Sequence, residues 1–320
     1  MNTIDIVGQY NQSDLKRIIR EQFTTRPDLE GEIHLIISGN ASLQSLFSAI
    51  SIRGFFEQVT ILELRSIPQL RNIKALEKFV NLKEFVFIDC GSRLSSATRD
   101  YFPTNLNKLE HIEILHGMNL EITSFSHYPN LRTLMIRKRY DTHIAIPEDI
   151  GNLTNLRKIS ILGCVPNFPL ERLTQLEFLE IVGETNDLHR IFFSREINKL
   201  PNLEFLSINF SLDTFSEGDL PKLNKLKIVS IPFIYDYRNI TNLSEIEINH
   251  PPSSRTEIIN EVFENLCECL GLKKIHISGG LLTEIPPEIG NLVNLESLNL
   301  SANRIKVLPK EIGNLVNLKY

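Results

Sequence analysis

The sequence predicts an α/β repeat solenoid, in which short parallel strands line a concave face and helices, 3₁₀ turns or extended segments lie outside. One phrase occurs three times, as PEDIGNLTNL from Pro147, PPEIGNLVNL from Pro286 and PKEIGNLVNL from Pro309. The pattern L-x-x-L-x-L recurs at spacings of 20 to 29 residues, and its last two spacings are both 23. A sustained period of this length indicates stacked structural repeats.

Each repeat contains a short strand with one buried face. The second and third apolar positions of the pattern are apolar in every repeat, from Leu35 and Ile37 to Leu298 and Leu300. Alternation of this kind predicts a strand. The alternative, a mixed α/β enzyme with unrelated strands, would not keep such a period. The repeats start at Glu32, Val59, Leu82, Leu109, Leu131, Leu156, Leu176, Leu203, Leu223, Leu243, Leu272 and Leu295.

The stretch LNLSANRIKVLPKEIGNLVNL, which starts at Leu298, resembles the leucine-rich repeat family, in particular its intracellular type of about 23 residues. The resemblance covers about residues 32–320 and is strongest over 131–164 and 272–320. It implies a curved horseshoe with a parallel sheet on the concave face and mixed helical, 3₁₀ and extended outer segments.

The turn position of each repeat departs from the family pattern in most of the chain. The resemblance implies Asn or Cys there, with a side chain that satisfies backbone groups between neighbouring repeats. Asn40, Cys90, Cys164 and Asn303 fit, and the other eight repeats do not. We therefore expect irregular curvature in the middle, with helical outer segments at residues 71–80 and 257–271, where apolar residues recur at helical spacing.

The chain divides into a cap and a solenoid. We expect residues 1–31 to cap the first repeat with a strand at Ile4 and Ile6 and a helix that starts at Ser13, because an uncovered terminal repeat would expose its core. Residues 32–320 form about twelve repeats and an incomplete last one, which stops at Tyr320. We expect truncation or continuation at that end, with contact through an uncapped sheet edge as the alternative.

Composition excludes several classes of partner. The net charge of −5 gives no electrostatic case for nucleic acid or an anionic membrane. We found no secretory signal, no membrane span and no paired spacing among the four cysteines, which together predict a cytoplasmic protein with reduced thiols. Secretion by a route that needs no N-terminal signal stays open, and so does the oligomeric state.

No catalytic, cofactor or metal motif occurs in the sequence. Cys267 and Cys269 make one close pair, but a structural zinc site needs four ligands, and no second pair is near. Glu245 and Glu247 lie on one face of a strand, which is common on solvated sheets. We therefore expect no catalytic residue, no cofactor and no metal, and a protein that is not an enzyme.

Function is expected on the concave face, where side chains that alternate with the core residues point. Leu162, Phe178, Val182 and Phe205 form an apolar cluster on three consecutive strands, and exposed clusters of this kind mark interaction sites. A covering loop would instead make them core. The concave residues expected to contact a partner are Glu113, Met135, Arg137, Lys138, Lys158, Leu162, Phe178, Glu180, Val182, Phe205, Asn209 and Lys227.

Three functions fit a concave face of this composition. The leading hypothesis is a non-enzymatic module that binds a protein or peptide. The second is the recognition arm of a larger effector, ubiquitin-ligase-like or sensor protein, whose active domain lies beyond residue 320. A surface adhesin or carbohydrate binder is a weaker alternative, because few concave aromatic residues have polar neighbours.

Overall fold

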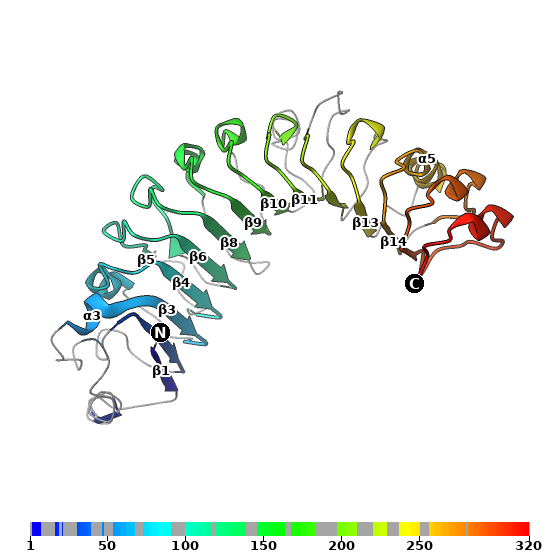
Figure 1. Cartoon of the computed structure of the whole chain (residues 1–320). Coiled ribbons are helices and arrows are strands. Elements are labelled where there is room, and N and C mark those ends of the chain that lie inside the picture. The colour runs from blue at the N-terminus through cyan, green and yellow to red at the C-terminus, as the bar shows by residue number, and fades with distance from the viewer. Residues whose placement is uncertain are drawn as a thin grey trace. The chain divides into compact units, whose positions relative to one another are not determined.

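The computed structural model describes residues 2–7, 17–18, 21, 31–39, 47, 54–67, 73–90, 100–116, 120–137, 146–163, 168–183, 197–209, 220–228, 237–249, 256–279 and 281–319. The chain forms two compact units, residues 1–158 and 159–320 (Figure 1). We call them the N-terminal unit and the C-terminal unit, and each is described by itself.

The N-terminal unit contains a parallel sheet whose strands follow chain order. Its outer segments include the helix α3 (Phe55–Gln58) and the 3₁₀ helices η1 (Ile73–Lys78) and η2 (Glu148–Asn152). A separate pair of short strands joins β5 (Asp100–Tyr101) to β7 (Leu120–Glu121). The strands of the main sheet are β1 (Asn2–Val7), β2 (Ile33–Ser38), β3 (Val59–Arg65), β4 (Glu84–Ile88), β6 (His111–Leu115) and β8 (Thr133–Arg137).

The C-terminal unit repeats this arrangement. Its outer segments are the helix α5 (Thr256–Cys267) and four 3₁₀ helices, η3 (Leu170–Arg172), η4 (Tyr237–Asn239), η5 (Pro287–Asn291) and η6 (Lys310–Asn314), within the part of the chain that the structure describes. The strand β9 begins at the last residue of the N-terminal unit. The strands are β9 (Lys158–Leu162), β10 (Phe178–Val182), β11 (Phe205–Ile208), β12 (Lys225–Ile228), β13 (Glu245–Asn249), β14 (Lys274–Ser278) and β15 (Ser297–Asn299).

The core consists of the inward positions that the repeat pattern predicts. All of these side chains are buried except Leu298 and Leu300, which are half-buried because no described strand follows β15. The opposite side chains of each strand lie on the face that the outer segments leave uncovered. We call this the open face; it is the concave face of the sequence prediction.

The expected cap is only partly visible. Strand β1 pairs in parallel with β2, and Ile4 and Ile6 are buried, as expected. Arg17, Ile18 and Glu21 are helical, but Ser13 and most of the expected helix lie outside the described residues. A cap over residues 1–31 therefore stays a prediction. The helix α5 confirms the expected helix at 257–271, and η1 confirms helical structure at 71–80.

The phrase that occurs three times forms the outer 3₁₀ helices η2, η5 and η6. Pro147, Pro286 and Pro309 precede them with φ between −61° and −69°, which is the range that the proline ring imposes. Ile150 and Ile289 then enter the core. The phrase recurs because each repeat must cover the core of its neighbour with the same turn.

The asparagine that precedes the first leucine of a repeat fastens that repeat to the one before. Its side-chain Nδ2 donates a hydrogen bond to a backbone carbonyl of the preceding repeat, at 2.7 Å from Asn81 to Glu57 and at 3.2 Å from Asn294 to Leu270. The repeat pattern alone assigns no structural role to this asparagine. The same bond is made by Asn130, Asn155, Asn202, Asn242 and Asn317. Asn105, four residues before Leu109, makes a similar bond to the Glu77 carbonyl at 2.7 Å.

The turn position has the role that the family resemblance implies, where it is occupied as expected. Asn303 Nδ2 donates to the carbonyl oxygens of Ile277 at 2.7 Å and Leu300 at 2.9 Å. The thiol of Cys90 is buried and donates to the Leu64 carbonyl at 3.3 Å. Asn40 and Cys164 lie outside the described residues.

Candidate functional site

The open face of the C-terminal unit carries two continuous rows of side chains. In-register pairing aligns the same position of each strand from β10 to β15, so each row runs across all six strands. The Phe178 row is Phe178, Phe205, Lys225, Glu245, Lys274 and Ser297. The Glu180 row beside it is Glu180, Ser207, Lys227, Glu247, His276 and Asn299.

The Phe178 row begins with two stacked aromatic rings. The rings of Phe178 and Phe205 lie 4.2 Å apart between centroids at an interplanar angle of 6°. Neighbouring parallel strands are ~4.8 Å apart, so two phenylalanines in register naturally stack. Lys225 Nζ lies 5.9 Å from the centroid of the Phe205 ring, within the range of a cation–π contact. Both rings are half-buried and keep part of their surface accessible.

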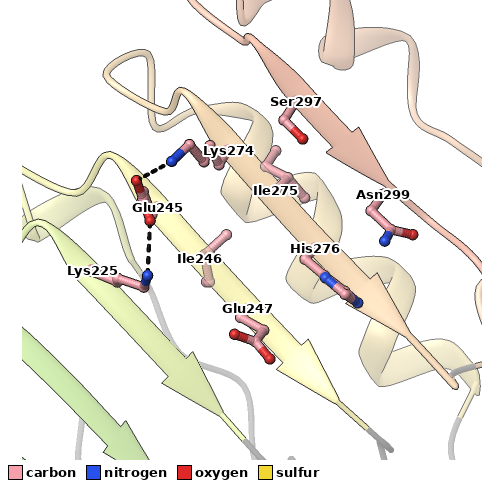
Figure 2. Close-up of a pocket in the computed structure, with 9 residues that line it drawn as sticks. All are labelled: Lys225, Glu245, Ile246, Glu247, Lys274, Ile275, His276, Ser297 and Asn299. Carbon is pink, nitrogen blue, oxygen red and sulfur yellow. Dashed lines mark hydrogen bonds and ion pairs between the residues drawn. The ribbon is translucent and has the colours of Figure 1, made fainter. Parts of the chain in front are cut away.

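The row continues as a ladder of ion pairs. Glu245 accepts from Lys274 at 2.7 Å and pairs with Lys225 at 3.1 Å (Figure 2). The hydrogen bond from Lys274 is the main cause that lowers the pKa of Glu245 below its usual value. One carboxylate therefore holds two lysine side chains in place across three strands.

The Glu180 row contains a second ion pair. Glu247 pairs with Lys227 at 3.0 Å and accepts a hydrogen bond from Asn249 at 2.6 Å. Burial raises the pKa of Glu247, but the hydrogen bonds from Asn249 and Lys227 outweigh it, and the net pKa is lowered. Glu245 and Glu247 are therefore both ionised at neutral pH.

A shallow pocket of about 290 Å³ lies over strands β12 to β15. Lys225, Glu245 and Lys274 lie along one side, and Glu247, His276 and Asn299 along the other (Figure 2). Because its walls carry both signs of charge, it can hold a polar group but offers little to an apolar one.

Two buried serines, Ser160 on β9 and Ser207 on β11, lie on the strands on either side of Glu180. Ser160 donates from Oγ to Glu180 at 2.6 Å, and both Ser160 and Ser207 are fully buried. Ser207 Oγ has no hydrogen-bond partner among the described residues. The hydrogen bond from Ser160 therefore fixes the position of the Glu180 carboxylate.

Some of the residues that the sequence predicted as a contact surface lie on the open face, and others are buried or lie outside the described residues. Phe178, Phe205, Glu180 and Lys227 lie together in the two rows. Leu162 and Val182 are half-buried, so the expected apolar cluster is partly accessible. Asn209 is buried, and its amide bonds to the backbone of Gly183, including a 3.0 Å bond from the Gly183 N–H. Its amide therefore serves the turn.

In the N-terminal unit, Glu113 and Met135 are half-buried on the open face and Arg137 is exposed. Lys158, where β9 begins, is half-buried. Lys138 lies outside the described residues.

The C-terminal rows contain residues that were not predicted to contact a partner. Glu245 and Glu247 were interpreted as a carboxylate pair on a solvated sheet. The signal that could have found them is the order Lys225, Glu245, Lys274 at one position of three consecutive repeats. Opposite charges in register on neighbouring strands attract one another.

Other kinds of site are not supported by the described residues. Within them, no group of three or more His, Cys, Asp or Glu side chains could hold a metal ion. Among the helices that the structure describes, none has the length and apolar character needed to cross a bilayer. Cys267 is buried, which raises the pKa of its thiol to about 12, and Cys269 is also buried.

Comparison with known proteins identifies the fold. No family model matches the sequence, and no curated protein matches it. Among solved structures, an internalin (InlF) of Listeria monocytogenes matches with a TM-score of 0.59 and 15% identity, over 96% of this chain and 93% of that chain. An LRR protein of Leptospira interrogans matches with a TM-score of 0.54 and 18% identity, over 93% of this chain and 85% of that chain.

The expected cytoplasmic location is wrong by this comparison, because internalins are surface or secreted proteins. The cysteines that supported it have a structural explanation. Cys90, Cys267 and Cys269 are free and buried, as packed core residues are in any compartment, so they do not indicate a location.

Proposed function

We propose that this chain, which has the leucine-rich repeat fold, is a non-enzymatic protein-binding module that holds a segment of its partner on the open face of the C-terminal unit. One observation carries the proposal. The Phe178–Phe205 stack continues in register into the Lys225–Glu245–Lys274 ladder, so an apolar anchor and a fixed set of charges lie along one line.

The stacked rings are suited to anchor a partner. They lie on the side of the sheet opposite the core, where the fold does not require an aromatic residue, and each keeps accessible surface. Aromatic side chains are enriched among the residues that dominate binding energy at interfaces. A partner side chain that covers both rings would bury apolar surface worth about 25 cal/mol per Å².

The ion-pair ladder supports the proposal in a different way. Lys225 and Lys274 are both held by Glu245 and lose little conformational freedom when a partner binds. Such preorganisation lowers the entropic cost of association. Five steps between the six strands give a row of ~24 Å, enough for about seven residues of an extended segment.

The pocket fits a side chain of a protein partner better than a free cofactor. At about 290 Å³ it lies at the lower limit of small-molecule sites, which are mostly apolar. Its walls are mainly charged or amide-bearing. We therefore assign it to a polar side chain of the partner, next to the apolar anchor on the rings.

The test is affinity capture from the source organism with variants matched for loss of apolar surface. Phe178→Ala with Phe205→Ala removes both rings. Val293→Ala with Val316→Ala is the control, because these valines are 48% and 81% exposed and lie on turns away from the open face. We expect the phenylalanine variant to lose its captured protein by at least about 30-fold, as for loss of two anchors of ~1 kcal/mol or more each.

Thermal unfolding distinguishes a binding role from a packing role. The phenylalanine variant should stay folded and lose about 3–5 kcal/mol of stability, because two half-buried rings lose part of the ~3–5 kcal/mol of a buried Phe→Ala each and the pair adds ~0.5–1.5 kcal/mol. Equal capture by the two variants would contradict the proposal. So would a loss of folding in the phenylalanine variant, which would show that the rings belong to the core.

A further inference from the structure

The open face of the N-terminal unit has a different chemistry from that of the C-terminal unit. In-register pairing places one central side chain from each of five consecutive strands, β2, β3, β4, β6 and β8, in a row. Apolar and acidic side chains alternate along it. The row, called the Ile36 row below, is Ile36, Glu63, Val86, Glu113 and Met135.

The apolar members of the row have apolar neighbours. Ile61 lies on one side, and Ile88 and Leu115, paired in register, lie on the other. All three are half-buried, as are Ile36, Val86 and Met135. Each of the five strands therefore presents at least one accessible aliphatic side chain. Contiguous apolar surface of this kind is characteristic of interaction sites.

Among the described residues, two carboxylates of this face form no ion pair with a lysine or arginine. Glu63 is satisfied by Arg65 and by His34, whose Nε2 lies 2.7 Å from its carboxylate. Glu113 has only His111, at 3.6 Å, and Glu84 is in register with His111 on the neighbouring strand. Within the described part of the chain, no Lys or Arg forms an ion pair with Glu84 or Glu113. These two negative charges are available to a ligand.

The charge balance favours a cationic partner over nucleic acid or an anionic membrane. Strands β1 to β8 present four carboxylates on this face, at Asp5, Glu63, Glu84 and Glu113. Among the strand residues that the structure describes on this face, Arg65 and Arg137 are the lysines or arginines that oppose them. With the pair Glu63–Arg65 neutralised, the remaining field is negative and would repel phosphate groups.

The spacing of the Ile36 row selects the conformation of the partner. Strands are ~4.8 Å apart, so side chains of one kind recur along the row every ~9.6 Å. An extended peptide presents side chains on one face every ~6.8 Å, which does not match. Two turns of an α-helix rise ~10.8 Å, and residues i and i+7 are ~10.5 Å apart. A helix laid along the row can therefore place apolar residues i, i+7 and i+14 on Ile36, Val86 and Met135, with residues i+10 or i+11 over Glu113.

We propose that the Ile36 row is a second binding surface, which takes an amphipathic helix of a protein partner with apolar residues at i and i+7 and Lys or Arg between them. The surface uses other residues than the site on the C-terminal unit. The two proposals therefore stand or fall separately.

The test uses a displayed library of helical peptides of about 20 residues, with leucine fixed at i, i+7 and i+14 and the other positions random, selected on the whole chain. We expect selected peptides to be enriched in Lys or Arg at i+10 and i+11, which lie over Glu113, more than at i+3 and i+4, which lie over the paired Glu63. Affinity of a selected peptide should fall at least about tenfold in Glu84→Gln with Glu113→Gln, because charge-assisted hydrogen bonds are the strong ones. It should also weaken with added salt.

The matched control is Glu57→Gln with Glu77→Gln. It removes the same charge from exposed residues of α3 and η1, outside the sheet, and should leave affinity unchanged. The proposal is overturned if no peptide is selected, if the selected peptides lack Lys and Arg, or if the two double variants weaken binding equally. Selected peptides that keep their affinity in the Glu84→Gln, Glu113→Gln variant but lose it in Phe178→Ala would assign binding to the C-terminal unit. That result would also overturn the proposal.

Discussion

Replacement of Asn303 by alanine should weaken the turn that follows β15 and its attachment to β14. The Asn303 amide donates to the carbonyls of Ile277 and Leu300 at 2.7 and 2.9 Å and accepts from the Leu282 N–H at 3.3 Å. Alanine leaves these three backbone groups without that partner. At about 1 kcal/mol for each net hydrogen bond, and with partial replacement by water, the cost is about 2–3 kcal/mol.

Asn294→Ala is the matched control, because it removes one exposed bond, at 3.2 Å to the Leu270 carbonyl. Water can replace that bond, so the cost should stay below about 1 kcal/mol. Urea unfolding followed by circular dichroism measures both differences. A repeat contacts only its neighbours and can open locally. Amide hydrogen exchange at residues 274–300 should therefore be measured as well, and it should be faster in Asn303→Ala. Equal costs for the two variants would refute the role assigned to the turn asparagine.

Three further predictions concern charge, thiols and the core. Lys274 lowers the pKa of Glu245 in the folded protein, so Glu245 contributes stability above its unfolded pKa, and this contribution is lost as pH falls through the folded pKa. Glu245→Gln should therefore flatten the acid side of a plot of melting temperature against pH. An unchanged slope would contradict the ion-pair ladder. Burial raises the pKa of the Cys90 thiol to about 11, so iodoacetamide at pH 8 should label it only after unfolding, as peptide mass spectrometry can check. Ile275→Ala should cost about 2–5 kcal/mol and Leu298→Ala less than half of that, because only Ile275 is fully covered; the reverse order in urea unfolding would be incompatible with the core described.

The fold was predictable from the sequence because the period fixes it. Residues such as Leu134 and Ile136 recur at the same two positions in each repeat, and a strand with one buried face is the structure that fits both. The role of the asparagine before each first leucine was not predictable in this way. Its hydrogen bond reaches a carbonyl more than twenty residues earlier, as from Asn81 to Glu57, and depends on how two repeats stack.

The candidate site was predictable in part. The rows follow from strand register, so the stacking of Phe178 on Phe205 was within reach of the sequence. The pairing of Glu245 with Lys225 and Lys274 was also indicated by their shared position in three consecutive repeats, but the side-chain conformations that let one carboxylate bind both lysines were not. Asn209 shows the same limit, because the sequence places it on the open face while its amide bonds to the backbone of Gly183.

The most direct measurement of the central claim, that the open face of the C-terminal unit holds a protein partner, is site-specific photo-crosslinking. A photoreactive phenylalanine analogue at Phe205, in the whole chain mixed with proteins of the source organism, should give a defined covalent adduct on irradiation. The analogue at Val293, which is exposed on a turn away from the open face, should not. Adduct formation at Val293 alone, equal adducts at both positions, or none at Phe205 would contradict the claim.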